Sequence, residues 1–313
     1  MAKRKPTYHV RNWTEYNRSL VQRGSLTVWV SSDVVAAWTA VRLSGKRGHP
    51  QTYSDLAIEA MATVRAVYHL PLRATQGLLS SIFKLMAVTL PVPSYATLSR
   101  RQPGLQFKPP QRQAGEAVHL VVDSTGVKVF GEGEWKVRQH GVTKRRTWKK
   151  LHIGVDEATG AILAVAVTDN SRADATELPG LLDQIAAPIQ QVSGDTAYDT
   201  RGCYDAIRGR EARATIPPRR NAKIWQHAHT KADRLIRDEN LRAIRRAGRT
   251  AWKQTSGYHR RSLAETAMSR FKRILGPTLS ARTFAGQAAE IHVRCQILNR
   301  MRQLGAPDSY RVA

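Results

Sequence analysis

The chain has 313 residues, enough to bury a full hydrophobic core and, on length alone, to form two domains. Its 50 lysines and arginines outnumber its 24 acidic residues, and a net charge of +26 attracts polyanions such as nucleic acid. No apolar run approaches the roughly 20 residues that span a bilayer, the first residues form no signal-peptide core, and two cysteines are too few for a disulfide framework, so we expect a soluble, cytoplasmic protein without a membrane partner.

Residues 1–115 predict an all-helical module that ends in a linker. A short apolar helix follows Ser31, and Thr52 with Asp55 predicts a capping box that opens a second helix. Pro71 then begins a third helix, whose apolar residues recur at helical spacing.

A fourth helix of this module is short and basic. Ser94 can cap the segment SYATLSRRQ, which includes Arg100 and Arg101 and resembles the second helix of a helix-turn-helix unit. In such a unit an arginine can fork onto guanine, although a basic helix at a domain edge is more often a solvated face. The prolines of residues 101–115 mark a linker.

From residue 116 the pattern changes to strands and then alternates helices with strands. Strands are predicted for AVHLVVD, VKVFGEGEWKV, the two halves of LHIGVDEATGAILAVAVTD, QQVSGD and ARATIPP. Helices are predicted for ELPGLLDQIAA and TRGCYDAIRG. This order predicts an α/β domain over residues 116–305, with a mixed sheet and flanking helices, followed by a frayed tail at 306–313.

Two carboxylates each close an apolar strand at a turn of small residues. Asp123 precedes Ser-Thr-Gly, and Asp195 ends VSGD. Strand ends are where α/β sheets place ligand sites, although a single aspartate there is more often a turn former. Asp156, Asp169 and Asp199 are competing candidates, with Asp199 the closest rival of Asp195.

A polar, strongly basic insertion interrupts this domain at about residues 218–256. Its helical centre spreads arginines round much of its circumference, which suits phosphate contact, although a solvated basic helix is an alternative. These arginines are Arg234, Arg237, Arg242, Arg245, Arg246 and Arg249. Trp225 and Trp252 bracket the stretch and could stack on an unpaired base, although tryptophan is more often a core residue.

The segment YHRRSLAETAMSRFK, residues 258–272, predicts a helix with two different faces. Tyr258, Arg261, Glu265 and Lys272 fall together at about 100° per residue, opposite an apolar face of Leu263, Ala267, Phe271 and Ile274. Most such polar faces only meet solvent. One carboxylate among two cations and a phenol also suits a site that holds a metal ion beside a phosphate chain. A further helix is predicted for GQAAEIHVRCQILNRMRQL.

The spacing of these four polar residues resembles the Tyr-Arg-Glu-Lys signature of bacterial insertion-sequence transposases of the Asp-Asp-Glu type. RNWTEYNRSLVQRGSLTVW, VDSTG and SGDTAYDTR further resemble the family named for insertion sequence five. The resemblance implies a ribonuclease-H-like core with a mixed five-stranded sheet, in which Asp123, Asp195 and Glu265 converge as catalytic metal ligands. It also implies Mg²⁺ as the cofactor, with Mn²⁺ as a substitute, because carboxylate oxygens suit such hard cations.

The expected function is therefore cut-and-paste transposition in the bacterial cytoplasm, close to the nucleoid. The expected partner is double-stranded DNA, both the terminal inverted repeats of the element and the target, bound by a homodimer; no small-molecule substrate is expected. Tyr258, Arg261, Lys272, Arg100, Arg101, Arg242, Arg245 and Arg246 are the expected DNA-binding residues. Two alternatives are a related nuclease without strand transfer and a catalytically silent DNA-binding repressor.

Overall fold

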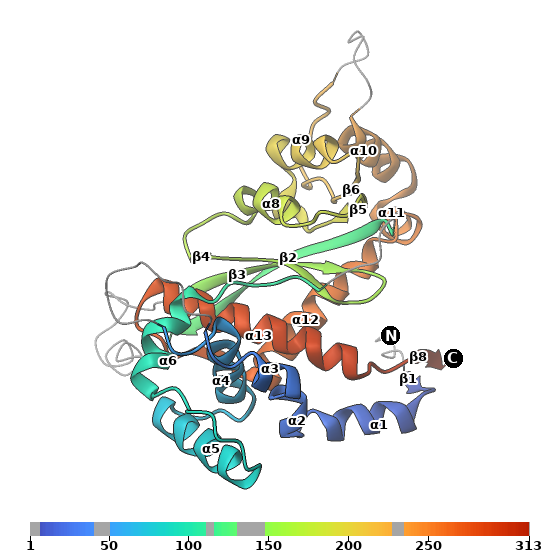
Figure 1. Ribbon diagram of the computed structural model, residues 1–313. Helices are drawn as coiled ribbons and strands as arrows, with labels where there is room; N and C mark the ends of the chain where they lie inside the picture. Colours follow the sequence, from blue (N-terminus) through green and yellow to red (C-terminus); the bar gives the residue numbers. More distant parts are fainter. Residues whose placement is uncertain (1–6, 41–50, 111–115, 130–147, 227–234, 313) are drawn as a thin grey trace, which may run out of the picture. The chain divides into compact units, whose positions relative to one another are not determined.

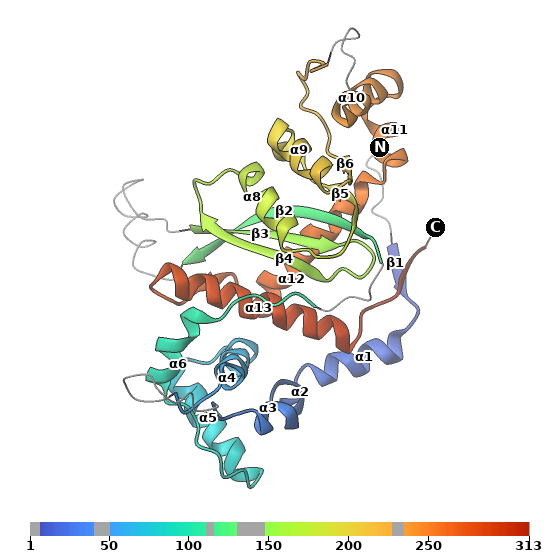
Figure 2. The same cartoon turned by 45° about the horizontal axis from the view of Figure 1, so that its top comes forward.

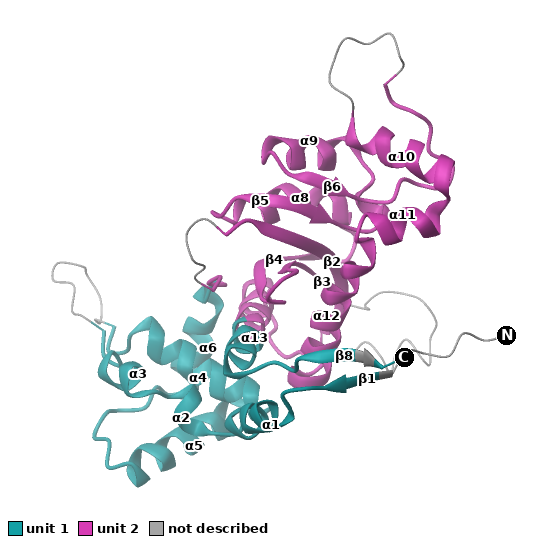
Figure 3. Cartoon of the chain, turned by 90° about the vertical axis from the view of Figure 1, so that its right-hand side faces the viewer, with its two compact units in different colours: residues 1–106, 296–313 teal, residues 107–295 magenta. Residues whose placement is uncertain are grey.

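The computed structural model describes residues 7–40, 51–110, 116–129, 148–226 and 235–312 (Figure 1). The chain divides into two compact units, coloured separately in Figure 3. The first comprises residues 1–106 together with 296–313, and the second comprises residues 107–295. None of the helices in the described ranges combines the length and the apolarity needed to cross a bilayer.

Helices make up most of the first unit. They are α1 (Trp13–Gln22), α2 (Leu26–Trp29), α3 (Ser32–Ala36), α4 (Asp55–Val67), α5 (Leu72–Leu85), α6 (Tyr95–Arg101) and the 3₁₀ turn η1 (Gln102–Gly104). The predicted helices are confirmed, but the cap of α4 is Ser54 rather than Thr52, because the Ser54 hydroxyl accepts the Ala57 amide at 3.1 Å. Trp38 and Phe83 pack in the core with ring centroids 4.9 Å apart.

The first unit also contains two short strands, so the all-helical expectation is not confirmed. β1 (Thr7–Val10) pairs antiparallel with β8 (Ser309–Val312). The Arg11 amide continues the pairing by donating to the Asp308 carbonyl at 2.8 Å. The segment expected to be a frayed tail is therefore a strand, ordered by a partner at the opposite end of the sequence.

The second unit is built on a six-stranded mixed sheet. Its strands are β2 (Val118–Val129), β3 (Trp148–Asp156), β4 (Ile162–Asp169), β5 (Ile189–Ser193), β6 (Arg213–Thr215) and β7 (Thr278–Leu279). They lie in the order β4-β3-β2-β5-β6, with β7 pairing off this path to β2. β3 is antiparallel to β2 and β4, whereas β5 runs parallel to β2 and β6. The mixed α/β class is confirmed, with one strand more than the five expected.

Helices cover both faces of this sheet (Figures 1 and 2). α8 (Asp174–Asp183) and α9 (Arg201–Gly209) lie on one face, where buried leucines of α8 pack against Val118, Leu120 and Val122 of β2. α12 (Ser262–Leu275) lies on the other face and contacts β2 and β3. The insertion forms α10 (Ile236–Ala247) and α11 (Arg249–Thr255), and the last helix is α13 (Phe284–Leu304).

One predicted boundary in the sheet is wrong. Ser-Thr-Gly after Asp123 was expected to form a turn, but β2 continues through it without a break. β3 pairs with β2 from Leu120 to Lys128, so its hydrogen bonds hold these turn-prone residues in extended conformation. Most of the next predicted strand, VKVFGEGEWKV, lies outside the described residues.

Candidate active site

Strands β2 and β5 bring two of the predicted carboxylates to the same end of their parallel pair. Val121 pairs with Ser193, and Asp123 and Asp195 each lie two residues further along the chain. One edge of β2 pairs with β3 as far as Lys128. The other edge pairs first with β5 and then, from Lys128, with β7. The parallel register therefore places the two aspartates where β2 and β5 separate.

Backbone amides orient one oxygen of each aspartate. Asp123 Oδ1 accepts the Ser124 amide at 2.8 Å. Asp195 caps the 3₁₀ turn η2 (Thr196–Tyr198), and its Oδ1 accepts the Ala197 amide at 2.8 Å. The remaining oxygen of each carboxylate is left for other partners.

Helix α12 supplies the third carboxylate, Glu265, from its first turn. The helix predicted from residue 258 begins later, because Gly257 has a positive φ of 69° and a 3₁₀ turn, η3 (Tyr258–Arg261), precedes α12. The buried side of α12 consists of Ala264, Ala267, Met268, Phe271 and Leu275. Leu263 and Ile274, predicted for this side, are only half-buried.

Arg261 joins two of the three carboxylates. Its Nη1 donates to Asp123 Oδ2 at 3.0 Å, and its Nη2 donates to Glu265 Oε1. The Asp123 side chain is 16% exposed, whereas that of Glu265 is 54% exposed, so the bridge links an inner carboxylate to an outer one. The structure thus brings together residues that lie 138 positions apart in the sequence.

Lys272 and Tyr258 take different partners. Lys272 Nζ donates to Thr125 Oγ1 at 2.7 Å. Thr125 lies two residues after Asp123 and so on the same face of β2, a periodicity that could have identified it from the sequence had this stretch been assigned to a strand. The Tyr258 ring lies against Trp252, with centroids 5.7 Å apart, and the Arg261 guanidinium is 5.9 Å from its centroid.

Burial and nearby charges shift the pKa values of Asp123 and Tyr258. Burial raises the pKa of Asp123, the Ser124 amide and Arg261 lower it, and the charges of Asp195 and Glu265 raise it again. Burial likewise raises the pKa of Tyr258, which Arg261 lowers and the same three carboxylates raise. Asp195 is therefore close enough to Asp123 and Tyr258 for its charge to act on both.

The described residues contain no group of three or more His, Cys, Asp or Glu side chains placed to hold a metal ion. The Arg261 guanidinium bridges Asp123 and Glu265. Both offer carboxylate oxygens, which are the donor type that a magnesium-type ion prefers. The three metal ligands stay a prediction.

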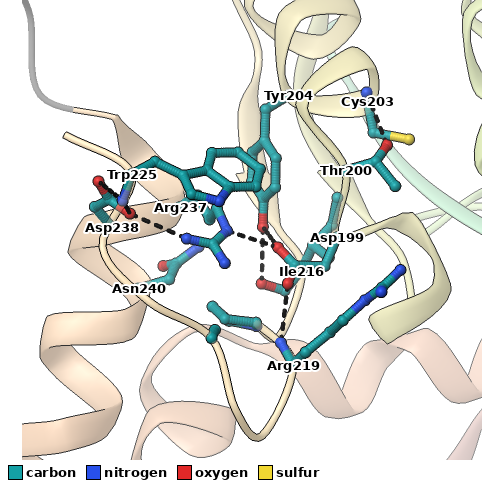
Figure 4. Close-up of polar contacts among 12 residues, drawn as sticks. Asp199, Thr200, Cys203, Tyr204, Ile216, Arg219, Trp225, Arg237, Asp238 and Asn240 are labelled. Carbon is teal, nitrogen blue, oxygen red and sulfur yellow. Dashed lines mark hydrogen bonds and ion pairs between the residues drawn. The ribbon is translucent and has the colours of Figure 1, made fainter.

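The closest rival carboxylate, Asp199, is committed to a buried network (Figure 4). Its Oδ1 accepts from Arg237 Nε at 2.9 Å, and its Oδ2 accepts the Arg219 amide at 2.9 Å. The Arg237 and Asp199 side chains are 4% and 1% exposed, and Arg237 also contacts Asp238. These partners give Asp199 a structural role in tying α10 to the segment after β5.

The other two rivals also have structural partners. Asp156 is fully buried and accepts the Thr159 amide at 3.2 Å in the turn between β3 and β4. Asp169 pairs with Lys149 across β4 and β3. The sequence interpretation missed a further carboxylate, Asp174, which accepts from Ser124 Oγ at 2.7 Å on the opposite face of β2.

Several arginines expected to bind DNA have partners within their own unit. Arg101 donates to Asp55 Oδ1 at 2.6 Å and so ties α6 to α4, whereas Arg100 is exposed. Arg242 pairs with Glu239 at 2.7 Å, and Arg245 donates to the Ala222 carbonyl at 3.2 Å.

The prediction that every arginine of the insertion suits phosphate contact rather than core packing is wrong for Arg237, which is buried. Arg246 is exposed, and Arg249 donates to the Pro218 carbonyl at 2.7 Å. Arg234 lies outside the described residues.

Both tryptophans of the insertion pack inside the second unit. The Arg237 guanidinium lies 3.8 Å from the Trp225 ring centroid, and Tyr204 meets the same ring edge-on (Figure 4). Trp252 is 4% exposed, and its Nε1 donates to Asn240 at 3.2 Å. Trp252 is therefore a core residue, as the core interpretation predicts, whereas Trp225 is half-buried and packs against the core.

Comparison with protein families gives two matches, both to models described as a transposase DDE domain. One covers residues 21–132 and so overlaps most of the predicted DNA-binding domain, residues 1–115. The other covers residues 114–300, more than half of the chain, and spans Asp123, Asp195 and Glu265. The chain therefore belongs to the family of DDE-domain transposases.

Proposed function

We propose that this transposase binds the terminal inverted repeats of its own insertion element, cleaves the DNA at their ends and joins the freed 3′ hydroxyls to target DNA. Two observations support the proposal: the parallel register brings Asp123 and Asp195 to the same end of the β2–β5 pair, and Arg261 bridges Asp123 to Glu265 on α12. The mixed sheet with helices on both faces is consistent with a ribonuclease-H-like core, and the resemblance to the insertion sequence five family belongs to the same proposal.

In this proposal Asp123, Asp195 and Glu265 hold Mg²⁺, for which Mn²⁺ can substitute. When bound, such ions activate an attacking hydroxyl and stabilise the leaving oxygen at phosphorus. The backbone amides of Ser124 and Ala197 orient the two aspartates before any ligand arrives. Preorganised ligands lower the cost of assembling the site.

The cations and the phenol around the carboxylates hold the DNA backbone. Lys272 lies two helical turns from Glu265, about 10 Å along the axis, so it contacts a phosphate beyond the one that reacts. Arg261 presents a fork of donors that matches two phosphate oxygens. Tyr258 packs against Trp252 beside Arg261.

Recognition of the element ends is assigned to residues 1–115, with Arg100 on α6 as the exposed contact. Arg242, Arg245 and Arg246 of α10 add phosphate contacts from the insertion. The net charge of +26 supports double-stranded DNA as the partner. Two ends must be processed together, so we propose a homodimer on DNA, working in the bacterial cytoplasm near the nucleoid.

The test uses the DNA that flanks the gene. The purified full chain is incubated with a fragment that contains any matched inverted repeats found there, with Mg²⁺ or with a chelator, and with a target plasmid. The proposal predicts metal-dependent nicks at the repeat ends and covalent joining of the ends to the plasmid. Cleavage without joining would indicate a nuclease, and binding without cleavage a repressor.

A further inference from the structure

The bridge made by Arg261 places a positive charge where the proposed metal ion has to bind. We propose that, in the DNA-free protein, the Arg261 guanidinium acts as an internal cation between Asp123 and Glu265 and competes with the metal ion for them. Metal binding then releases the guanidinium toward the DNA phosphate. This inference rests on the proposed function, because it assigns the metal to the same carboxylates.

The hydrogen bonds define the competition. Arg261 uses separate nitrogens for the two carboxylates, Nη1 for Asp123 Oδ2 and Nη2 for Glu265 Oε1. Asp123 Oδ1 already accepts a hydrogen bond from the Ser124 backbone amide, so a metal ion would compete for Oδ2 with the Arg261 side chain alone rather than with the backbone. The oxygen that is better placed to bind a metal ion is thus the one that the guanidinium occupies.

Two cations cannot share that oxygen at low cost. Mg²⁺ binds carboxylate oxygen at about 2.0–2.1 Å, and Arg261 Nη1 lies 3.0 Å from Asp123 Oδ2. An ion on Oδ2 would therefore lie within about 5 Å of the guanidinium nitrogen, where like charges repel strongly in a partly buried site. The Asp123 and Arg261 side chains are 16% and 21% exposed, so water screens this repulsion incompletely.

The position of Arg261 in the chain allows its guanidinium to move away from Asp123 and Glu265. Arg261 ends the turn η3, just before α12, its guanidinium lies 5.9 Å from the Tyr258 ring centroid, and its side chain is partly exposed. A change of side-chain rotamer can move the guanidinium without moving Glu265 or the helix. A phosphate diester offers the displaced guanidinium two oxygens in place of the two carboxylates. Metal binding and backbone contact are thereby coupled through one side chain.

Binding of Mn²⁺ to the DNA-free full chain tests the proposal, with free Mn²⁺ measured by electron paramagnetic resonance. Arg261→Gln, which keeps polar bulk but no charge, is expected to bind Mn²⁺ on the order of tenfold more tightly than the wild type. Without metal it is expected to melt at a lower temperature, and Mn²⁺ should raise its melting temperature more than that of the wild type. Arg260→Gln is the matched control, because Arg260 pairs with Glu157 instead, and it should bind Mn²⁺ like the wild type.

Two further variants separate the possible outcomes. Asp195→Asn should weaken Mn²⁺ binding; if it does and Arg261→Gln binds no better than the wild type, the competition is refuted while the proposed function stands. If Asp195→Asn binds Mn²⁺ as tightly as the wild type, the metal is bound elsewhere and both proposals fail. If Arg261→Gln does not fold, Arg261→Lys decides, because one ammonium cannot reproduce the two-nitrogen bridge and an intermediate gain in affinity is expected.

Discussion

Lys272 and Arg261 fall on the same side of the α12 segment but contact different groups, a hydroxyl in one case and two carboxylates in the other. The different contacts of Lys272 and Arg261 indicate different roles for the two side chains. Arg261 bridges two carboxylates, whereas the Lys272 ammonium donates to a neutral hydroxyl. We propose that a DNA phosphate is the charged partner of Lys272.

Lys272→Ala should therefore weaken binding of end DNA and reduce the salt dependence by about one phosphate contact. Affinity is measured by fluorescence anisotropy over a salt series. Thr125→Val is the matched control, because it removes the hydroxyl that Lys272 contacts and leaves the ammonium in place. If Lys272→Ala and Thr125→Val give the same salt slope as the wild type, Lys272 does not contact phosphate.

The sequence predicts Asp123, Asp195 and Glu265 as the site, but the choice of Asp195 over Asp199 came from the family resemblance rather than from a physical argument. Both aspartates follow the same strand and have the same chemistry. The deciding contact is the buried pair of Asp199 with Arg237, 38 residues away. Arg237 itself was placed among surface arginines, because a helix periodicity does not reveal a buried carboxylate contributed by another segment.

The basic insertion is anchored to the sheet domain by the first turn of α10. Arg237 and Asp238 both lie in the first turn of this helix and are buried. Asp238 accepts the Gln226 amide at 2.8 Å, and Arg237 reaches Asp199 beside η2. The insertion and the segment that carries Asp195 therefore share one buried ionic network.

Arg237→Met should destabilise the protein by about 3 kcal/mol or more, because it leaves the Asp199 carboxylate buried without its cation. Unfolding in urea measures the loss. Adding Asp199→Asn should restore much of the stability, since the uncompensated charge is removed. Arg246→Met, on the exposed side of the same helix, should change nothing measurable. Equal stabilities of Arg237→Met and Arg246→Met would show that the network does not hold the insertion.

Element types were predictable where periodicity was long, as in β3, β4, α5 and α13. The errors have local causes. Ser-Thr-Gly after Asp123 has turn chemistry, but cross-strand pairing with β3 overrides it. The start of α12 was misplaced because a 3₁₀ turn and an α-helix share nearly the same polar spacing over four residues.

In the whole molecule, the first unit includes the end of the chain, which no pattern in the sequence indicated. Besides pairing β8 with β1, this segment contacts α1, where Asn12 Nδ2 donates to the Ala306 carbonyl at 3.0 Å. Two-stranded ribbons are marginal alone, so such additional contacts matter for β1.

A chain that ends at residue 304 should therefore lose amide protection in β1 and at Arg11, because β8 and the Asp308 carbonyl are removed. Hydrogen exchange followed by mass spectrometry measures this. Amides of β3, whose partners remain, serve as the internal control. Unchanged protection in β1 would show that the ribbon does not order the start of the chain.

We propose that Asp123, Asp195 and Glu265 perform the phosphoryl transfer. The most direct measurement is single-turnover cleavage of end DNA at saturating DNA and Mg²⁺, with binding measured in parallel, for Asp123→Asn, Asp195→Asn, Glu265→Gln and Asp199→Asn. The first three should each cleave at least about a hundredfold more slowly, because several kcal/mol of charge stabilisation are lost, while binding changes only a few fold. Asp199→Asn, checked for folding by circular dichroism, should retain cleavage. Normal cleavage by Asp195→Asn together with loss of cleavage in folded Asp199→Asn would contradict the assignment.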